Sequence, residues 1–248
     1  MPADALYYQL MFTHKFYCVP FLLASFLLAA PLSSTVSAQT LAAAAPCFVV
    51  PATDEQADVT LTATGLTPGD DVDAMSGPVS TLDGSLEQGF FYFFRETTVA
   101  PSGNAVFVSS VNTGTPFPWV GSATVTVDDT SSDIADIVST PIDVTQLALE
   151  IGNENVFAPT KTTTWMASGL IGENVYAHLM QPRTHRVFTV KIGATTGPCG
   201  FIETKAKGFP LNKSQFRTGT WLYQLDGSAK YSTATNPKVI SSYHFYNL

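Results

Sequence analysis

Three carboxylates crowd into one short stretch of the sequence, where Asp70, Asp71 and Asp73 fill three of four consecutive positions. Hard cations such as Ca²⁺ bind several oxygen ligands that flexible turns supply, so these three residues are candidate calcium ligands. A second acidic cluster follows at Asp128, Asp129 and Asp133. The alternative is a solvated acidic turn, because Asp favours turn positions. The sequence holds no EF-hand loop, and we expect no cofactor apart from this candidate calcium ion.

Two of the three cysteines, Cys47 and Cys199, lie beyond the N-terminal apolar segment that contains Cys18. In an oxidising compartment two cysteines favour a disulfide. Two domains laid end to end would instead hold them too far apart, because Cα atoms beyond about 7 Å cannot be bridged. A Cys47–Cys199 bond and free or intermolecular thiols therefore both stay open.

Residues for catalysis are sparse. There is no G-x-S-x-G nucleophile motif. Cys199 sits in the turn 197–200, and the histidines of the same half are His178, His185 and His244. The histidine spacing is unlike that of a zinc site, where three or four ligands converge. We therefore expect no catalytic residues and no enzyme, with a small secreted hydrolase or thiol enzyme of unrecognised site as the alternative.

Basic residues cluster around one predicted hairpin, at Arg183, His185, Arg186 and Lys191, and others follow at Lys205 and Lys207. Such a surface suits an anionic cell-wall polymer, an unknown protein, or the chain's own acidic half. Its charge density is modest for a nucleic-acid-binding protein, so we expect no nucleic acid partner. Ordinary solubilising lysines are the alternative.

The densest run of aromatic residues comprises Phe90, Phe91, Tyr92, Phe93 and Phe94. A strand of a one-core sandwich should alternate between apolar and polar residues. An uninterrupted run indicates either a strand buried on both faces or an exposed face used for binding. It is therefore a candidate interface.

The N-terminus resembles a secretory signal peptide. Lys15 precedes an uncharged apolar run, Phe16–Leu32, and small residues follow at Val36-Ser37-Ala38. This order of basic, apolar and small residues predicts cleavage after Ala38. A membrane anchor is the alternative, but a spanning helix needs about 20 apolar residues, so we expect a secreted or extracellular protein with no transmembrane segment in its mature chain.

The net charge of −8 hides an asymmetry between two halves. Residues 39–145 hold fourteen acids and one base, whereas residues 146–248 hold five acids and ten bases. Such asymmetry usually reports two units with different surfaces. The sequence predicts a signal peptide over 1–38, an acidic domain over 39–145 and a basic domain over 146–248.

An internal repeat supports two domains of the same kind. Ala63–Leu66 and Gly69–Ala74 recur as Ala167–Leu170 and Gly172–Ala177, with an offset of about 100 residues. Both copies indicate a strand, a Gly-Leu turn and a second strand. The repeat length matches an immunoglobulin-like sandwich.

Few charges and many β-branched and aromatic residues favour short strands joined by turns. In the first half the strands are expected at 90–95, 105–111 and 123–127. In the second half they are expected at 147–150, 162–167, 174–180, 187–192, 201–206, 219–225 and 239–245.

The second half also resembles a known kind of domain between Trp165 and Tyr231. The resemblance rests on Trp165, Ala167–Gly169, Val175–His178, Gly197–Gly200, Phe209-Pro210, Gly219–Trp221, Gln224, Asp226 and Tyr231. This segment is similar to a C-terminal domain of secreted bacterial proteins with tandem immunoglobulin-like modules. The resemblance implies that fold and export, but no catalytic residue.

The sequence thus predicts an all-β protein of two tandem immunoglobulin-like β-sandwich domains behind a signal peptide. Its expected role is a non-enzymatic secreted or cell-envelope protein that serves binding, adhesion or spacing.

Overall fold

The computed structural model describes residues 38–51, 55–77, 79–81, 86–87, 93–111, 118–129, 138–153, 155–172 and 174–246. Residues Val36–Leu248 belong to one compact unit. Residues 1–37 of the predicted signal peptide lie outside the described residues. In the part that is described, no helix is long and apolar enough to cross a membrane.

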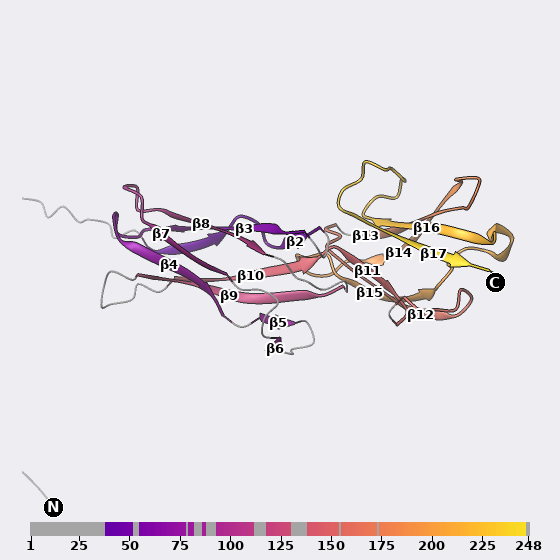
Figure 1. The fold of residues 1–248 in the computed structure, drawn as a ribbon, viewed down its shortest axis with the longest axis horizontal. Coiled ribbons are helices and arrows are strands. Elements are labelled where there is room, and N and C mark those ends of the chain that lie inside the picture. The colour runs from indigo at the N-terminus through magenta and orange to yellow at the C-terminus, as the bar shows by residue number, and fades with distance from the viewer. Residues whose placement is uncertain are drawn as a thin grey trace, which may run out of the picture. The chain divides into compact units, whose positions relative to one another are not determined.

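The protein is all-β, and the described chain before Leu147 forms two sheets (Figure 1). One sheet has the order β1-β3-β8 and the other has β2-β10-β9-β4-β7, with β5 and β6 attached beside β9. We call this part the first lobe. Its strands are β1 (Thr40–Ala43), β2 (Phe48–Val50), β3 (Ala57–Thr64), β4 (Asp71–Ser76), β5 (Val79–Thr81), β6 (Leu86–Glu87), β7 (Phe94–Thr98), β8 (Ala105–Val111), β9 (Val120–Asp129) and β10 (Val138–Gln146).

The remaining strands form a second lobe of two sheets, in the orders β11-β12-β15 and β14-β13-β16-β17. These strands are β11 (Ala148–Ile151), β12 (Thr162–Ser168), β13 (Asn174–Met180), β14 (Val187–Ala194), β15 (Ile202–Lys207), β16 (Gly219–Asp226) and β17 (Lys238–Phe245). A short 3₁₀ turn, η1 (Lys213–Gln215), precedes β16.

Alternation of side chains explains both sandwiches. In β8 every second residue from Ala105 to Val111 is buried, and the residues between them are exposed. A pleated strand sends successive side chains to opposite faces, so such a strand buries one face and hydrates the other. Each lobe has its own hydrophobic cluster, one built around residues such as Leu61 and Phe107 and the other around Trp165 and Trp221.

The sequence repeat corresponds to equivalent strands. β3 lies between β1 and β8, as β12 lies between β11 and β15. Each of these central strands ends at a glycine in the left-handed region, Gly65 with φ 77° and Gly169 with φ 79°. A left-handed turn favours glycine because it has no Cβ. The repeated Gly-Leu pair therefore marks the same turn in both lobes.

The two halves are joined covalently by a disulfide between Cys47 and Cys199, whose Cα atoms are 5.2 Å apart. The expectation that tandem domains would keep these residues apart is wrong. β2 pairs in parallel with the end of β10, with Phe48 opposite Val144, and this pairing brings Cys47 beside the strand that leads into the second lobe. Val120, Val49 and Phe201 pack around the bond, which is buried.

The expected strands agree with the structure to within a few residues at most positions. β8 and β13 have the predicted bounds, and the other five described strands from β12 onward differ by one or two residues. The aromatic segment differs more, because the strand there is β7 and begins at Phe94. The boundary between residues 145 and 146 stays a prediction, since β10 continues through it to Gln146.

Candidate ligand-binding site

Strand direction gathers several loops at one end of the second lobe. β13 runs antiparallel to both β14 and β16, so the end of β13, the start of β14 and the start of β16 lie together. β15 runs antiparallel to β12, with Lys207 opposite Thr162. The turn that contains Cys199 lies at the opposite end of β14 and β15. We call the end that carries the β13–β14 loop and the start of β16 the loop end of the second lobe.

A hydrogen-bonded loop, 181–186, connects β13 to β14 at this end. The backbone N–H of Gln181 donates to the carbonyl of Arg186 at 2.8 Å, and that of His185 donates to the carbonyl of Gln181 at 3.2 Å. The Gln181 side chain is buried. Its amide donates to the carbonyl of Gln215, and its oxygen accepts from the Thr184 hydroxyl at 2.6 Å. Gln181 therefore ties this loop to the segment before β16.

Two residues of the loop have unusual backbone conformations. Arg183 has φ 68° and His185 has φ 54°, and both lie in the left-handed region that favours glycine. Non-glycine residues in this region cost about 1–3 kcal/mol each and occur often at binding sites. The loop holds two basic side chains in place at an energetic cost.

The opposite wall of the site comes from the start of β16. Gly219 has φ 128°, and a Cβ at this position would lie 3.1 Å from the Cβ of Pro182. Glycine thus lets the Pro182 ring approach the β16 backbone closely. The Trp221 indole donates to the carbonyl of Arg217 at 2.8 Å, which fixes the residues that enter the strand.

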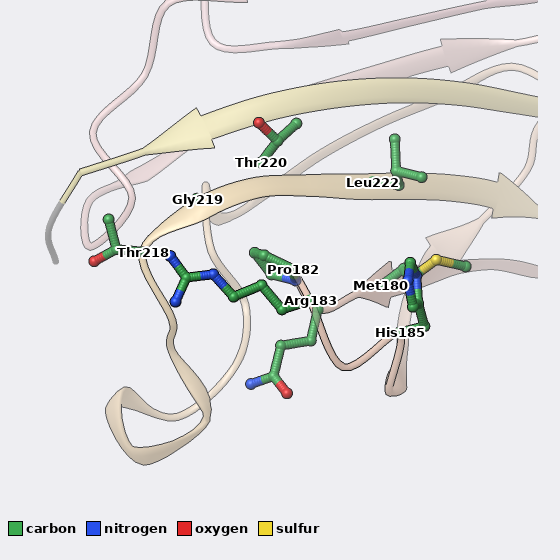
Figure 2. Close-up of a pocket in the computed structure, with 9 residues that line it drawn as sticks. Met180, Pro182, Arg183, His185, Thr218, Gly219, Thr220 and Leu222 are labelled. Atoms are coloured by element: carbon green, nitrogen blue, oxygen red, sulfur yellow. The ribbon is translucent and has the colours of Figure 1, made fainter.

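A cavity of about 300 Å³ lies between these two walls. Figure 2 shows Arg183 extending from its loop toward Thr218. We call this cavity the Arg183 pocket. Its lining residues are Met180, Gln181, Pro182, Arg183, His185, Thr218, Gly219, Thr220 and Leu222.

The Arg183 pocket combines positive charge, hydroxyl groups and an apolar surface. Arg183 is exposed, and neither it nor His185 forms a side-chain hydrogen bond or ion pair with any residue that the structure describes. Thr220 and His244 are hydrogen-bonded at 2.8 Å on the neighbouring strands. No described carboxylate lines the pocket. Arg183 can therefore pair with an anionic group without displacing an existing partner.

A second polar cluster lies on the outer face of the β14-β13-β16-β17 sheet. The imidazole of His178 and the carboxylate of Asp226 are both fully buried and 3.3 Å apart. His178 Nε2 also lies 3.0 Å from the carbonyl of Ser228, and Nδ1 lies 2.8 Å from the hydroxyl of Thr189. A carbonyl only accepts, so Nε2 carries a proton and donates.

The order of Thr189, His178 and Asp226 resembles a nucleophile, a base and an orienting carboxylate. The surrounding contacts indicate a structural role. Asp226 accepts from the backbone N–H of Ser228 at 2.7 Å, and the ring of Tyr231 packs edge-on against His178. Fully satisfied buried networks fix a single arrangement. This cluster therefore anchors the loop after β16 onto the sheet.

The candidate calcium residues follow one another at the start of β4. Asp71 accepts a hydrogen bond from the Thr98 hydroxyl at 2.8 Å. Asp73 lies opposite Glu96 on one side and Asp128 on the other. Among the described residues, no group of three or more His, Cys, Asp or Glu side chains is arranged to hold a metal ion. The calcium site at Asp70, Asp71 and Asp73 stays a prediction.

The candidate interface is only partly described. Phe93 is fully buried in the core of the first lobe, and Phe94 is half-buried. Phe93 therefore packs against its own lobe rather than offering a surface to a partner. Phe90, Phe91 and Tyr92 lie outside the described residues.

Cys199 is half of the disulfide and carries no free thiol for catalysis. Of the predicted basic residues, Arg183 and His185 meet in the pocket, whereas Lys191 lies opposite Tyr176, toward the other end of β13. Sequence reasoning missed Thr218, Gly219 and Thr220 as parts of the site. The sequence did offer one signal for this part of the site, Gly219 at the start of a predicted strand, because a glycine in a strand often marks the close approach of a ligand or of another segment of backbone.

Comparisons with known proteins give matches to solved structures at low sequence identity. No protein-family model matches, and no curated protein matches. A PapD-like domain of human CEP192 matches with 11% identity and a TM-score of 0.31, covering 54% of this chain and 97% of that domain.

Two further solved structures match over more of this chain. Red sea bream transglutaminase has 13% identity and a TM-score of 0.32, and the match covers 84% of this chain and 31% of the transglutaminase. A tetra-tandem repeat from the extending region of a large adhesion protein has 15% identity and a TM-score of 0.27, with 83% and 48% of the two chains covered. The chain thus spans less than half of either of these two proteins.

Proposed function

We propose that this chain is an exported, non-enzymatic binding protein of the extracellular space or cell envelope, and that its second lobe binds an anionic polymer at the Arg183 pocket. The observation that carries the proposal is the guanidinium of Arg183. It has no acidic partner among the described residues, and it is held beside a cavity by a loop with two left-handed residues.

The chemistry of the pocket suits a carboxylate or phosphate on a polyhydroxylated chain. A guanidinium presents a planar fork of donors that matches either anion with two parallel hydrogen bonds. Thr218 and Thr220 also line the pocket, and their hydroxyls are hydrogen-bonded to the carbonyl of Tyr246 and to His244. Met180 and Leu222 offer an apolar surface to the carbon skeleton of the ligand.

An extracellular location is supported by two independent features. The Cys47–Cys199 disulfide joins positions 152 residues apart, and disulfides persist chiefly in oxidising compartments. The N-terminal sequence has the order of a secretion signal. Anionic polymers of the cell surface are accessible to a protein in that location.

The test is a calorimetric titration of residues 39–248 with polygalacturonate, a carboxylate polymer, and with glycerol-phosphate teichoic acid, a phosphate polymer. A charge-assisted hydrogen bond contributes about 1.5–3 kcal/mol. Arg183→Ala should therefore weaken binding by about ten- to a hundred-fold. The affinity of Arg183→Lys should lie between those of the unmodified chain and Arg183→Ala, because lysine keeps the positive charge but lacks the planar fork of donors.

Lys230→Ala is the matched control. It also removes one positive charge, but Lys230 is exposed in the loop after β16, away from the pocket. It should change the affinity less than twofold. Equal losses in Arg183→Ala and Lys230→Ala would show that only overall charge matters and would contradict the proposed site.

A further inference from the structure

A second hollow lies at the loop end of the second lobe. It has a volume of about 140 Å³ and is lined by Pro159, Thr160, Lys207, Phe209, Leu211 and Lys213. We call it the Lys207 pocket. Lys207 is the last residue of β15 and Lys213 is the first residue of η1. Both side chains are exposed, and no described carboxylate lines the hollow.

The backbone around the Lys207 pocket is held firmly. The N–H of Phe209 donates to the carbonyl of Pro159 at 2.8 Å, and the hydroxyl of Tyr223 donates to the carbonyl of Gly208 at 3.1 Å. The ring of Phe209 is buried and packs edge-on against Trp221, with ring centroids 4.9 Å apart. Phe209 thus links the floor of this hollow to the strand that lines the Arg183 pocket.

One segment, 208–218, borders both hollows. Lys213 lines one and Thr218 lines the other. Five residues of fully extended chain span at most about 18 Å, and the 3₁₀ turn in this segment shortens the distance. Arg217 lies between them and donates only to backbone carbonyls, those of Ser214 and Phe216. Its positive charge is therefore not neutralised by a described carboxylate.

Cations gather at the loop end more than elsewhere in the second lobe. Six of its ten lysines and arginines lie there, namely Lys161, Arg183, Arg186, Lys207, Lys213 and Arg217. Of the described acids of this lobe, Asp226 ends β16 and Glu203 lies near the start of β15, both toward the opposite end, and Glu150 is buried. Separate cationic hollows on a fixed backbone suit a ligand with repeated charges.

We infer that the two hollows are consecutive subsites for one linear anionic polysaccharide, which contacts Arg183 in one hollow and Lys207 and Lys213 in the other. This inference rests on the proposed function. A folded acidic protein would usually cover a broader surface, whereas these hollows are small, concave and partly lined by threonine hydroxyls. Linking two weak contacts in one ligand raises affinity without any new contact.

The experiment compares galacturonate oligomers of one, two, four and eight units by calorimetry on residues 39–248. We expect the affinity, corrected for the number of repeats, to rise at least tenfold from monomer to octamer. The Lys207→Ala/Lys213→Ala variant should lose this gain, so that it binds the octamer with no higher corrected affinity than the monomer. Arg183→Ala should weaken the binding of monomer and octamer alike.

The matched control is Lys191→Ala/Lys230→Ala, which removes the same charge from the other end of the sheet and should keep the length dependence. A corrected affinity that is independent of length would overturn the two-subsite inference and leave the proposed function intact. Binding of poly-glutamate or single-stranded DNA as tightly as the octamer would overturn the polysaccharide assignment. Absence of binding to every galacturonate and to teichoic acid would overturn both the inference and the proposed function.

Discussion

Single residues determine how the second lobe responds to pH. Tyr243 is half-buried, its hydroxyl donates to Asn155 at 2.9 Å, and burial raises its pKa to about 12. Burial also raises the pKa of Tyr223, which packs edge-on against Tyr243 with ring centroids 4.9 Å apart. A phenol whose folded pKa lies above its unfolded value binds its proton more tightly in the folded state.

The stability that comes from this tyrosine pair is therefore fully present below pH 10 and is lost as the pH rises toward 12 and beyond. We expect the melting temperature to fall between pH 10 and pH 12. Tyr243→Phe cannot ionise, so it should reduce the size of that fall, as measured by circular dichroism melts. An identical alkaline fall in Tyr243→Phe would contradict the assignment.

Like charges lie opposite one another on adjacent strands of the first lobe. Asp73 lies opposite both Glu96 and Asp128, and such pairs destabilise a sheet. Asp73→Asn should raise the melting temperature by a few degrees at low salt, and 1 M salt should remove most of the difference.

A second test at Asp73, Glu96 and Asp128 is the addition of calcium. If the cation binds there, millimolar calcium raises the melting temperature of the unmodified chain and not that of Asp73→Asn. A rise in melting temperature of less than about 1 °C in the unmodified chain would contradict calcium binding at these aspartates.

At the scale of elements, the Arg183 pocket depends on a close approach between two loops. The Pro182 ring packs against β16 because residue 219 is glycine with φ 128°. Gly219→Ala introduces both a strained conformation and a Cβ near Pro182, so it should cost about 1–3 kcal/mol of unfolding free energy. It should also weaken anion binding.

Gly77→Ala is the control for this substitution, because a Cβ there meets its nearest neighbour at an ordinary 3.5 Å. Urea unfolding and calorimetry would measure both variants. Unchanged stability and binding in Gly219→Ala would show that the pocket does not need this approach.

Much of the strand pattern could be predicted from local sequence, and the reasons are visible in particular elements. β8 and β13 alternate regularly or follow a clear turn, so their bounds are encoded locally. β2 has three residues, and its parallel partner lies more than 90 residues away. No local pattern predicts that pairing, and without it the disulfide looked sterically difficult.

The candidate site was only half predictable for a similar reason. The basic character of Arg183 and His185 is evident in the sequence, but the opposite wall at Thr218–Thr220 comes from a strand about 35 positions later. The buried amide of Gln181, which joins the two loops, becomes recognisable only through its contact with Gln215. The two walls of the Arg183 pocket come together through long-range packing, which local sequence patterns do not encode.

At the scale of the whole molecule, the Cys47–Cys199 disulfide closes a loop of about 150 residues. Cross-linking so long a loop restricts the unfolded chain, which in the chain-entropy model is worth about 5 kcal/mol. Cys47→Ser/Cys199→Ser should therefore lower the urea midpoint markedly. Reductant should lower the midpoint of the unmodified chain to a similar value and leave the double variant unchanged.

A double variant as stable as the unmodified chain would show that packing alone holds the unit together. The bond is surrounded by Val49, Val120 and Phe201, so their packing persists in part without it. The loss should accordingly lie between about 2 and 5 kcal/mol.

The loop end of the second lobe is the surface that we propose for binding an anionic polymer. The most direct test is a ¹H–¹⁵N NMR titration of residues 39–248 with octagalacturonate at physiological salt. We expect chemical-shift changes concentrated in residues 181–186 and 207–220, with the first lobe and the Cys199 turn unaffected. Changes spread over all lysines and arginines, or absent from residues 181–186, would contradict that proposal.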